Sequence, residues 1–392
     1  MENVIKKGKS RWIGAAVLVM LMLLCTGCTF LVSKEAPPYI EVTVEDTTFE
    51  DKFYYEQLSE EEQIVYQEIY RGIMDEQEEV YVHSADAERV SAIFEYVIYD
   101  FAEIFWSDGT VAATTYDDTF YTEVHTVLKL NYTYSSEEKS QKETEIENAV
   151  TEIVNGIPAE ASEYEKIKYV YEYLVNSVSY VEESPDNQNL YSSLVRKETV
   201  CAGYAKATQY LLNRMGFYCT YVIGTARRDG ETESHAWNIV RCNGNYYYVD
   251  VTWADPIVNE ADPMAVHDTI YDYLCCSEAT LAETHVKEAK YNYPECHSED
   301  LDYFRLNDMF YETVDDGQLL SKLRASIDAK AESITFKFAD AALYEQGRQR
   351  MLDKLMNTAA EYLCQRYRLN QVEYYYVEDA VLHKFTVYWS YQ

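Results

Sequence analysis

Basic side chains are scarce in this sequence. Its 392 residues contain 33 Lys and Arg against 68 Asp and Glu, a formal charge of −35 at pH 7. A surface of this sign repels phosphate, which excludes a nucleic-acid-binding protein as the leading hypothesis. A cationic partner, such as a Lys-rich chain or a polycationic wall component, would be attracted, although a strongly acidic surface is in most proteins only a solvated one.

Several familiar signatures are also missing. The sequence has no internal repeat and no low-complexity tract, which argues against a wall-spanning structural protein built from repeats. It has no phosphate loop, no dinucleotide fingerprint and no metalloprotease helix, so we predict no cofactor and no metal. With 47% hydrophobic residues, the chain is globular and long enough for two or three domains.

The N-terminus is typical of an export signal. Basic residues at positions 6–11 precede an apolar run over 12–24, which leads through small residues to Cys28. This pattern resembles a bacterial lipoprotein signal, in which the cysteine is lipidated and becomes the new N-terminus. We therefore predict a lipid on Cys28 that anchors the chain to the extracellular face of a bacterial cell membrane, in a Gram-positive organism.

One position departs from that signal, and it leaves an alternative open. Cys25 stands three residues before Cys28, where lipoprotein signals usually have Leu. Residues 12–32 are nearly all apolar and about long enough to span a bilayer, so an uncleaved transmembrane anchor is the alternative. Either arrangement places the bulk of the chain outside the membrane.

Seven cysteines remain after Cys25 and Cys28. Their number is odd and their spacing irregular, in a chain large enough to fold without crosslinks, so a disulfide framework is not indicated. A metal site could also be assembled from cysteines and histidines of the region 275–297, but their spacing fits no zinc pattern. The residues of that set are Cys275, Cys276, His285, Cys296 and His297.

Hydrophobic periodicity predicts a mixed α and β chain. Helices are expected over 58–74, 87–105, 143–156 and 163–178, and an alternating strand over 121–134. Residues 318–392 show the pattern helix, strand, helix, strands, with the strand at 334–338 and the second helix at 343–367. We predict a signal peptide (1–27), a tether (28–52), an N-terminal α/β module (53–149), a central domain (150–305) and a small C-terminal α/β module (306–392).

Cys201 stands where a helix is expected to begin, running to Met215 and ending at Gly216. The unpaired amides and the dipole of a helix start favour a thiolate. A cysteine at such a place is often only buried and inert. The functional interpretation of Cys201 depends on two strands that follow it in the sequence.

Those strands are joined by Asn243-Gly244, a strong signal for a two-residue β-hairpin loop that would pair Cys242 with Asn245. In this register His235 opposes Thr252 and Asp250 opposes Trp237. His235 and Asp250 then lie on one face as diagonal neighbours that could hydrogen-bond. The opposite face would be largely apolar and carry Ala236, Val240, Val249, Val251 and Trp253. Trp237 and Trp253 would therefore lie on opposite faces, and at most one need line a cleft.

A thiol, an imidazole and a carboxylate in this order are the three groups of a nucleophilic triad. The carboxylate of Asp250 would orient the ring of His235 and stabilise its cation, which in turn keeps the thiol of Cys201 ionised.

The sequences around these residues resemble three signature blocks of bacterial transglutaminase-like proteins. The blocks are Val200-Cys201-Ala202-Gly203-Tyr204-Ala205, Ser234-His235-Ala236-Trp237-Asn238 and Tyr248-Val249-Asp250-Val251-Thr252-Trp253. The resemblance implies an α+β chain whose core is papain-like, with the Cys helix packed on an antiparallel sheet. It also implies that Cys201, His235 and Asp250 are the catalytic nucleophile, base and orienting carboxylate.

The implied activity is acyl transfer on amide bonds of a protein or peptide substrate. Cell-wall peptides are among the substrates considered. A thioester on Cys201 would pass to water, as in a cysteine peptidase or amidase, or to an amine, as in a transglutaminase. The alternative is a non-catalytic cell-surface binding module that keeps the fold. An intact triad favours the enzyme, because a binding role gives no reason to keep all three groups.

Overall fold

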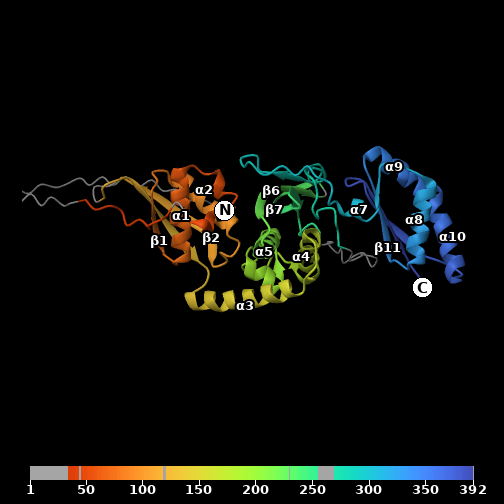
Figure 1. Cartoon of the computed structure of the whole chain (residues 1–392), viewed down its shortest axis with the longest axis horizontal. Helices are drawn as coiled ribbons and strands as arrows, with labels where there is room; N and C mark the ends of the chain where they lie inside the picture. Colours follow the sequence, from red (N-terminus) through yellow and green to blue (C-terminus); the bar gives the residue numbers. More distant parts are fainter. Residues whose placement is uncertain (1–33, 44–45, 118–120, 229, 255–268, 392) are drawn as a thin grey trace, which may run out of the picture. The chain divides into compact units, whose positions relative to one another are not determined.

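The computed structural model describes residues 34–43, 46–117, 121–228, 230–254 and 269–391. These residues, drawn in Figure 1, form two units. Unit 1 contains the described residues up to Glu152 together with Val181–Thr199, and unit 2 contains Ile153–Tyr180 and the described residues from Val200 onward. Each unit combines helices with antiparallel strands, so the predicted α+β class is confirmed. Cys28 lies outside the described residues.

Unit 1 combines helices with a three-stranded antiparallel sheet in the order β1-β3-β2. Its elements are two short 3-10 turns (Thr47–Phe49, Tyr55–Gln57), α1 (Glu60–Met74), β1 (Glu79–Val82), α2 (Ala87–Asp100), β2 (Ser107–Tyr116) and β3 (His125–Tyr132). Ser59 and Glu62 form a capping box at the start of α1. This start agrees with the helix expected over 58–74.

The structure of unit 1 departs from the predictions in several elements. The helix expected over 87–105 ends at Asp100, because Phe101 leaves the helical path and packs with its ring 4.2 Å from that of Tyr70. Only the central strand β3 was predicted. Its neighbours were missed, since β1 has four residues and β2 alternates only between exposed and half-buried positions.

α3 (Ser136–Asn155) starts seven residues before the expected residue 143, because its first turns are charged and carry no apolar period. The segment Val181–Thr199 belongs to unit 1 and is held there by side chains. Tyr191 donates to Glu145 Oε2 over 2.7 Å, and Tyr134 donates to Asp186 Oδ2 over 3.0 Å. A π-helical turn, Ser192–Arg196, lies in this segment.

Unit 2 begins with helices that pack near a four-stranded antiparallel sheet in the order β8-β7-β6-β9. The elements are α4 (Glu163–Ser177), β4 (Ser179–Tyr180), α5 (Cys201–Arg214), β6 (Cys219–Arg228), β7 (Glu231–Cys242), β8 (Asn245–Val249), α6 (Glu278–Leu281) and β9 (His285–Lys287). α5 contacts both β6 and β7, so the Cys helix does pack on the sheet as expected.

The predicted hairpin between β7 and β8 is present with the predicted register. Cys242 pairs with Asn245, and the ladder continues to the pair of Asn238 and Val249. Asn243 and Gly244 have φ values of 50° and 84°, which is the left-handed backbone that such a loop requires. Beyond Val249 the ladder stops, so the expected opposition of His235 and Thr252 does not occur.

The C-terminal part of unit 2 is a second sheet, ordered β10-β11-β13-β12, with helices that share one core with it. Its elements are α7 (Tyr303–Leu306), β10 (Phe310–Tyr311), α8 (Asp316–Asp328), β11 (Ser333–Phe338), α9 (Ala341–Arg350), a π turn (Met351–Leu355), α10 (Met356–Tyr367), β12 (Tyr374–Asp379) and β13 (Lys384–Trp389). The pattern helix, strand, helix, strands expected for 318–392 is confirmed.

A buried ion cluster joins this second sheet to the segment that follows β8. The side chain of Asp272 is fully buried and accepts from Lys337 Nζ over 2.5 Å and from Lys384. Burial alone would raise the pKa of Asp272, but the two ammonium groups hold it below its usual range. Tyr273, the next residue, accepts the backbone N–H of Asp250 over 3.0 Å.

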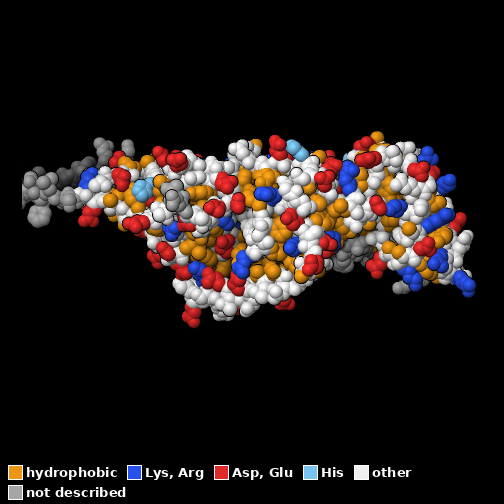
Figure 2. All heavy atoms as spheres, in the orientation of Figure 1, with side chains coloured by type: hydrophobic (Ala, Val, Ile, Leu, Met, Phe, Trp, Pro, Cys, Tyr) orange, Lys and Arg blue, Asp and Glu red, His pale blue; other side chains and the backbone are white. Residues whose placement is uncertain are grey.

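Acidic side chains are scattered over the face shown in Figure 2 and alternate with basic and apolar ones. This distribution favours a solvated acidic surface over a single cation-binding patch on that face. Within the described residues, no helix has both the length and the apolar character needed to cross a membrane.

Candidate active site

Cys201 is the first residue of α5. Val200, the N-cap, has an extended backbone and its carbonyl accepts the N–H groups of Gly203 and Tyr204. Two contacts hold the start of the helix: the Tyr204 hydroxyl donates to the Val178 carbonyl over 2.8 Å, and the Asn238 amide donates to the Ala205 carbonyl over 3.0 Å. Cys201 itself is half-buried, and its thiol lies at the start of the helix.

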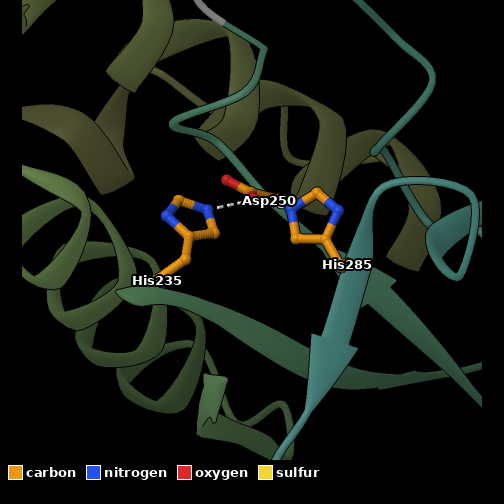
Figure 3. A group of neighbouring side chains, drawn as sticks. All are labelled: His235, Asp250 and His285. Carbon is orange, nitrogen blue, oxygen red and sulfur yellow. Dashed lines mark hydrogen bonds and ion pairs between the residues drawn. The ribbon is translucent and has the colours of Figure 1, made fainter. Parts of the chain in front are cut away.

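His235 and Asp250 meet across the end of the hairpin. His235 Nε2 lies 2.6 Å from Asp250 Oδ2, and both side chains are buried (Figure 3). Asp250 is the residue directly after β8, and its other oxygen, Oδ1, accepts the backbone N–H of Trp253 over 3.1 Å. The side chain of Asp250 is therefore held from two sides, which fixes its direction toward the imidazole.

The side chain of His235 also makes a hydrogen bond with that of Cys201. Burial alone would lower the pKa of His235, but the charge of Asp250, its hydrogen bond and the contact with Cys201 together raise the pKa to about 10. Burial likewise would raise the pKa of Asp250, and the imidazole beside it holds that pKa well below the usual range. The structure thus brings the three predicted site residues together in the order thiol, imidazole, carboxylate.

Both tryptophans lie beside the imidazole, although the predicted register placed them on opposite faces of the hairpin. The ring of Trp237 is 5.8 Å from that of His235, and the ring of Trp253 is 6.0 Å away. Trp237 shares a face with His235 as predicted. Trp253 reaches the same side because the strand ends at Val249 and the chain then turns, so the alternation of faces no longer applies.

His285 is a member of the site that sequence analysis missed. It is the first residue of β9, and its Nε2 lies 3.0 Å from Asp250 Oδ2, the same oxygen that contacts His235. Only three residues long, β9 is separated from Asp250 by 35 positions, so no periodicity or spacing could have indicated the contact. The sequence had placed His285 only in the cysteine-rich metal set.

That metal set is not assembled. Among the described residues, the one group of three whose ligand atoms lie close enough for a metal ion is His235, Asp250 and His285, with all ligand atoms within 4.8 Å. Its nitrogens are engaged in hydrogen bonds with the carboxylate, and a metal there would displace the contact between base and orienting group. The seven described cysteines are free thiols in this structure.

Comparison with known proteins supports the resemblance of the signature blocks. Residues 151–251 match the model of the Transglutaminase-like superfamily. This region of the chain is similar to that superfamily. The match includes Cys201, His235 and Asp250 and ends directly after Asp250, so His285 lies outside it. No curated protein matches the sequence.

Solved structures similar to this chain include a transglutaminase ("TGase"), at 14% identity over 40% of this chain and 48% of the other, with a TM-score of 0.27. A provisionally named cysteine protease from Cytophaga hutchinsonii has 14% identity over 38% of this chain and 65% of its own, with a TM-score of 0.25. Menin, with a binding site for the Mixed Lineage Leukemia protein, has 17% identity over 59% and 52%, with a TM-score of 0.23. The chain thus spans less than two thirds of the length of each.

Proposed function

We propose that this chain is a transglutaminase-like thiol enzyme that transfers acyl groups from amide substrates through Cys201. The observation that carries the proposal is that the side chain of His235 forms hydrogen bonds with both Asp250 and Cys201. A buried carboxylate that keeps the imidazole protonated also keeps a negative thiolate beside it favourable. A binding surface has no need for this arrangement.

In the first half of the reaction, the sulfur of Cys201 attacks the carbonyl carbon of the amide and a C–S bond forms. The backbone N–H of Cys201, at the helix start, supports the developing oxyanion. His235 then gives its proton to the leaving nitrogen, the C–N bond breaks, and an amine departs. Asp250 stays ionised throughout and holds the ring in place.

In the second half, the thioester is attacked by water or by a second amine. His235, now neutral, takes the proton of that nucleophile, and the C–S bond breaks to restore the starting thiolate and imidazolium. Water gives a carboxylate product, as in a peptidase or amidase. A second amine gives a new amide, as in a transglutaminase.

The substrate class we propose is a protein or peptide amide, including peptides of a bacterial wall. Lipidation of Cys28 would tether the enzyme to the outer face of the cell membrane, where such amides are within reach of a surface-anchored enzyme. No nucleic acid is expected as a partner, because the chain carries a net charge of −35.

Thiol labelling at pH 6.5 tests the ion pair directly. We expect iodoacetamide to modify Cys201 at least tenfold faster than Cys364, which is also half-buried but has no imidazole partner among the described residues. His235→Gln should remove that advantage, and Cys364→Ala should leave it unchanged. Equal labelling rates for the two cysteines in the wild-type chain would contradict the proposed enzymatic function.

A second assay separates the two reactions and the binding alternative. The full chain is incubated with a Gln-containing peptide, with a wall-type peptide and with a tagged primary amine, beside Cys201→Ala as control. Incorporation of the tag indicates amine transfer, whereas release of ammonia or of a shorter peptide indicates hydrolysis. Peptide binding that is equal in the wild type and in Cys201→Ala, with no turnover in either, would support the non-catalytic binding module instead.

A further inference from the structure

Two imidazoles share one carboxylate oxygen in this site. Asp250 Oδ2 lies 2.6 Å from His235 Nε2 and 3.0 Å from His285 Nε2, and the two rings stand on either side of it (Figure 3). They come from different strands, β7 and β9, which both pair with β6 between them. Paired positions of these strands lie on one face of the sheet, so both imidazoles point to the same place.

The second imidazole has a defined proton arrangement, supplied by the residue before it. Thr284 Oγ1 lies 2.8 Å from His285 Nδ1 and 3.1 Å from the hydroxyl of Tyr273. Burial raises the pKa of Tyr273 well above its usual range, so that hydroxyl keeps its proton and can donate it to Thr284. The Thr284 proton then goes to Nδ1, which is closer than its other acceptor, the Leu281 carbonyl at 3.5 Å.

This order leaves the hydrogen of His285 on Nε2, facing Asp250. The opposite tautomer would set a nitrogen lone pair against a carboxylate oxygen 3.0 Å away, which is repulsive. A continuous chain of hydrogen bonds therefore runs from Tyr273 through Thr284 and His285 to Asp250, and from Asp250 through His235.

His285 is enclosed by aromatic side chains. Its side chain is fully buried, and its ring contacts the rings of Trp253 at 4.6 Å, Trp237 at 5.2 Å and Tyr273 at 5.3 Å. A buried carboxylate that loses a hydrogen bond becomes less favourable as an anion and less fixed in direction.

We propose that His285 is a positioning residue, which keeps Asp250 ionised and aimed at His235 and thereby maintains the thiolate–imidazolium pair of the active site. The inference rests on the proposed function and deepens it by adding a fourth group to the triad. His285 does not touch Cys201 or the reacting atoms, so its effect passes through Asp250 alone.

Two substitutions separate positioning from packing. His285→Phe keeps a ring of similar shape against the tryptophans but has no donor, and His285→Gln can place an amide N–H near the position of Nε2. We expect His285→Phe to lower the alkylation rate of Cys201 at pH 6.5 and the turnover number by about tenfold or more, because a hydrogen bond to a charged group is lost. The KM should change little, and the pH profile of alkylation should move toward alkaline pH.

His285→Gln should recover most of the rate and the wild-type pH profile. Thr284→Val, which removes the proton relay but leaves the imidazole, should shift the profile in the same direction as His285→Phe and by less. All assays contain a chelator, so that a trace metal bound by the two histidines does not alter the rates. Circular dichroism and urea unfolding verify that each variant is folded.

The outcomes distinguish this inference from the function on which it rests. If the wild-type Cys201 is no more reactive than Cys364, the proposed function fails. If Cys201 is reactive and its pH profile and turnover are unchanged in His285→Phe, only the role of His285 fails. If His285→Phe does not fold, the other two variants decide. The inference is overturned if Thr284→Val leaves the pH profile of Cys201 alkylation unshifted and His285→Gln loses no more rate than its loss of folding stability explains.

Discussion

The charge of Asp250 should control how the stability of unit 2 depends on pH, and Asp250→Asn tests this. Asn has the same shape and can still accept the N–H of His235, so the substitution removes the charge with little change in packing. In the wild type, burial would lower the pKa of His235, but Asp250, with a smaller contribution from Cys201, raises it to about 10 from its ordinary 6.5. Without the carboxylate, burial should leave the pKa of His235 at or below that ordinary value.

The size and sign of the effect follow from this difference. A raised imidazole pKa contributes stability that is complete below pH 6.5 and is lost as pH rises toward 10. Three to four pH units at about 1.4 kcal/mol each give roughly 5 kcal/mol as an upper limit. The lowered pKa of Asp250 describes the same interaction from the other partner, and its contribution is lost as pH falls below the ordinary 3.8. The two contributions are therefore not added.

Histidine NMR measures the effect at the residue itself. The chain has seven histidines, and the resonance absent from His235→Gln identifies His235 in a sample labelled with ¹³C-histidine. We expect a titration midpoint near pH 10 in the wild type and at or below 6.5 in Asp250→Asn. Urea unfolding should show the stability difference between the two proteins largest near pH 6 and vanishing toward pH 10. A wild-type midpoint near 6.5, or one that Asp250→Asn does not move, would refute the reasoning.

Three further substitutions probe other parts of the fold. Asp272→Asn should destabilise unit 2 by about 3–5 kcal/mol in urea unfolding, because Lys337 and Lys384 would stay buried without their counter-charge; a loss under about 1 kcal/mol would show that the cluster is dispensable. Gly244→Ala should cost about 1–2 kcal/mol by thermal unfolding, since its φ is 84° and no atom lies near the added Cβ, so a much larger cost would indicate a steric contact. Burial raises the pKa of Asp100 to about 6, so the stability of unit 1 should fall between pH 4 and 6 as the buried carboxyl loses its proton. Asp100→Asn should make this fall smaller in urea unfolding, and an unchanged pH dependence would argue against the explanation.

Much of the site was determined by the sequence alone, because its key signals are local. A helix start at Cys201, a hairpin at Asn243-Gly244 and the register that follows depend on neighbouring residues only. The register is confirmed up to Val249, and it correctly places His235 and Asp250 on one side. Their catalytic role and the lipid on Cys28 stay predictions.

Only the tertiary structure decided what lies beyond those local signals. Trp253 joins the side of His235 because the chain turns after Val249, and the alternation of strand faces ends where the ladder ends. His285 reaches Asp250 from a strand of three residues, paired to the far side of β6. Contacts of this kind depend on sheet order and on where strands stop, which are set by packing across the whole unit and leave no period in the sequence.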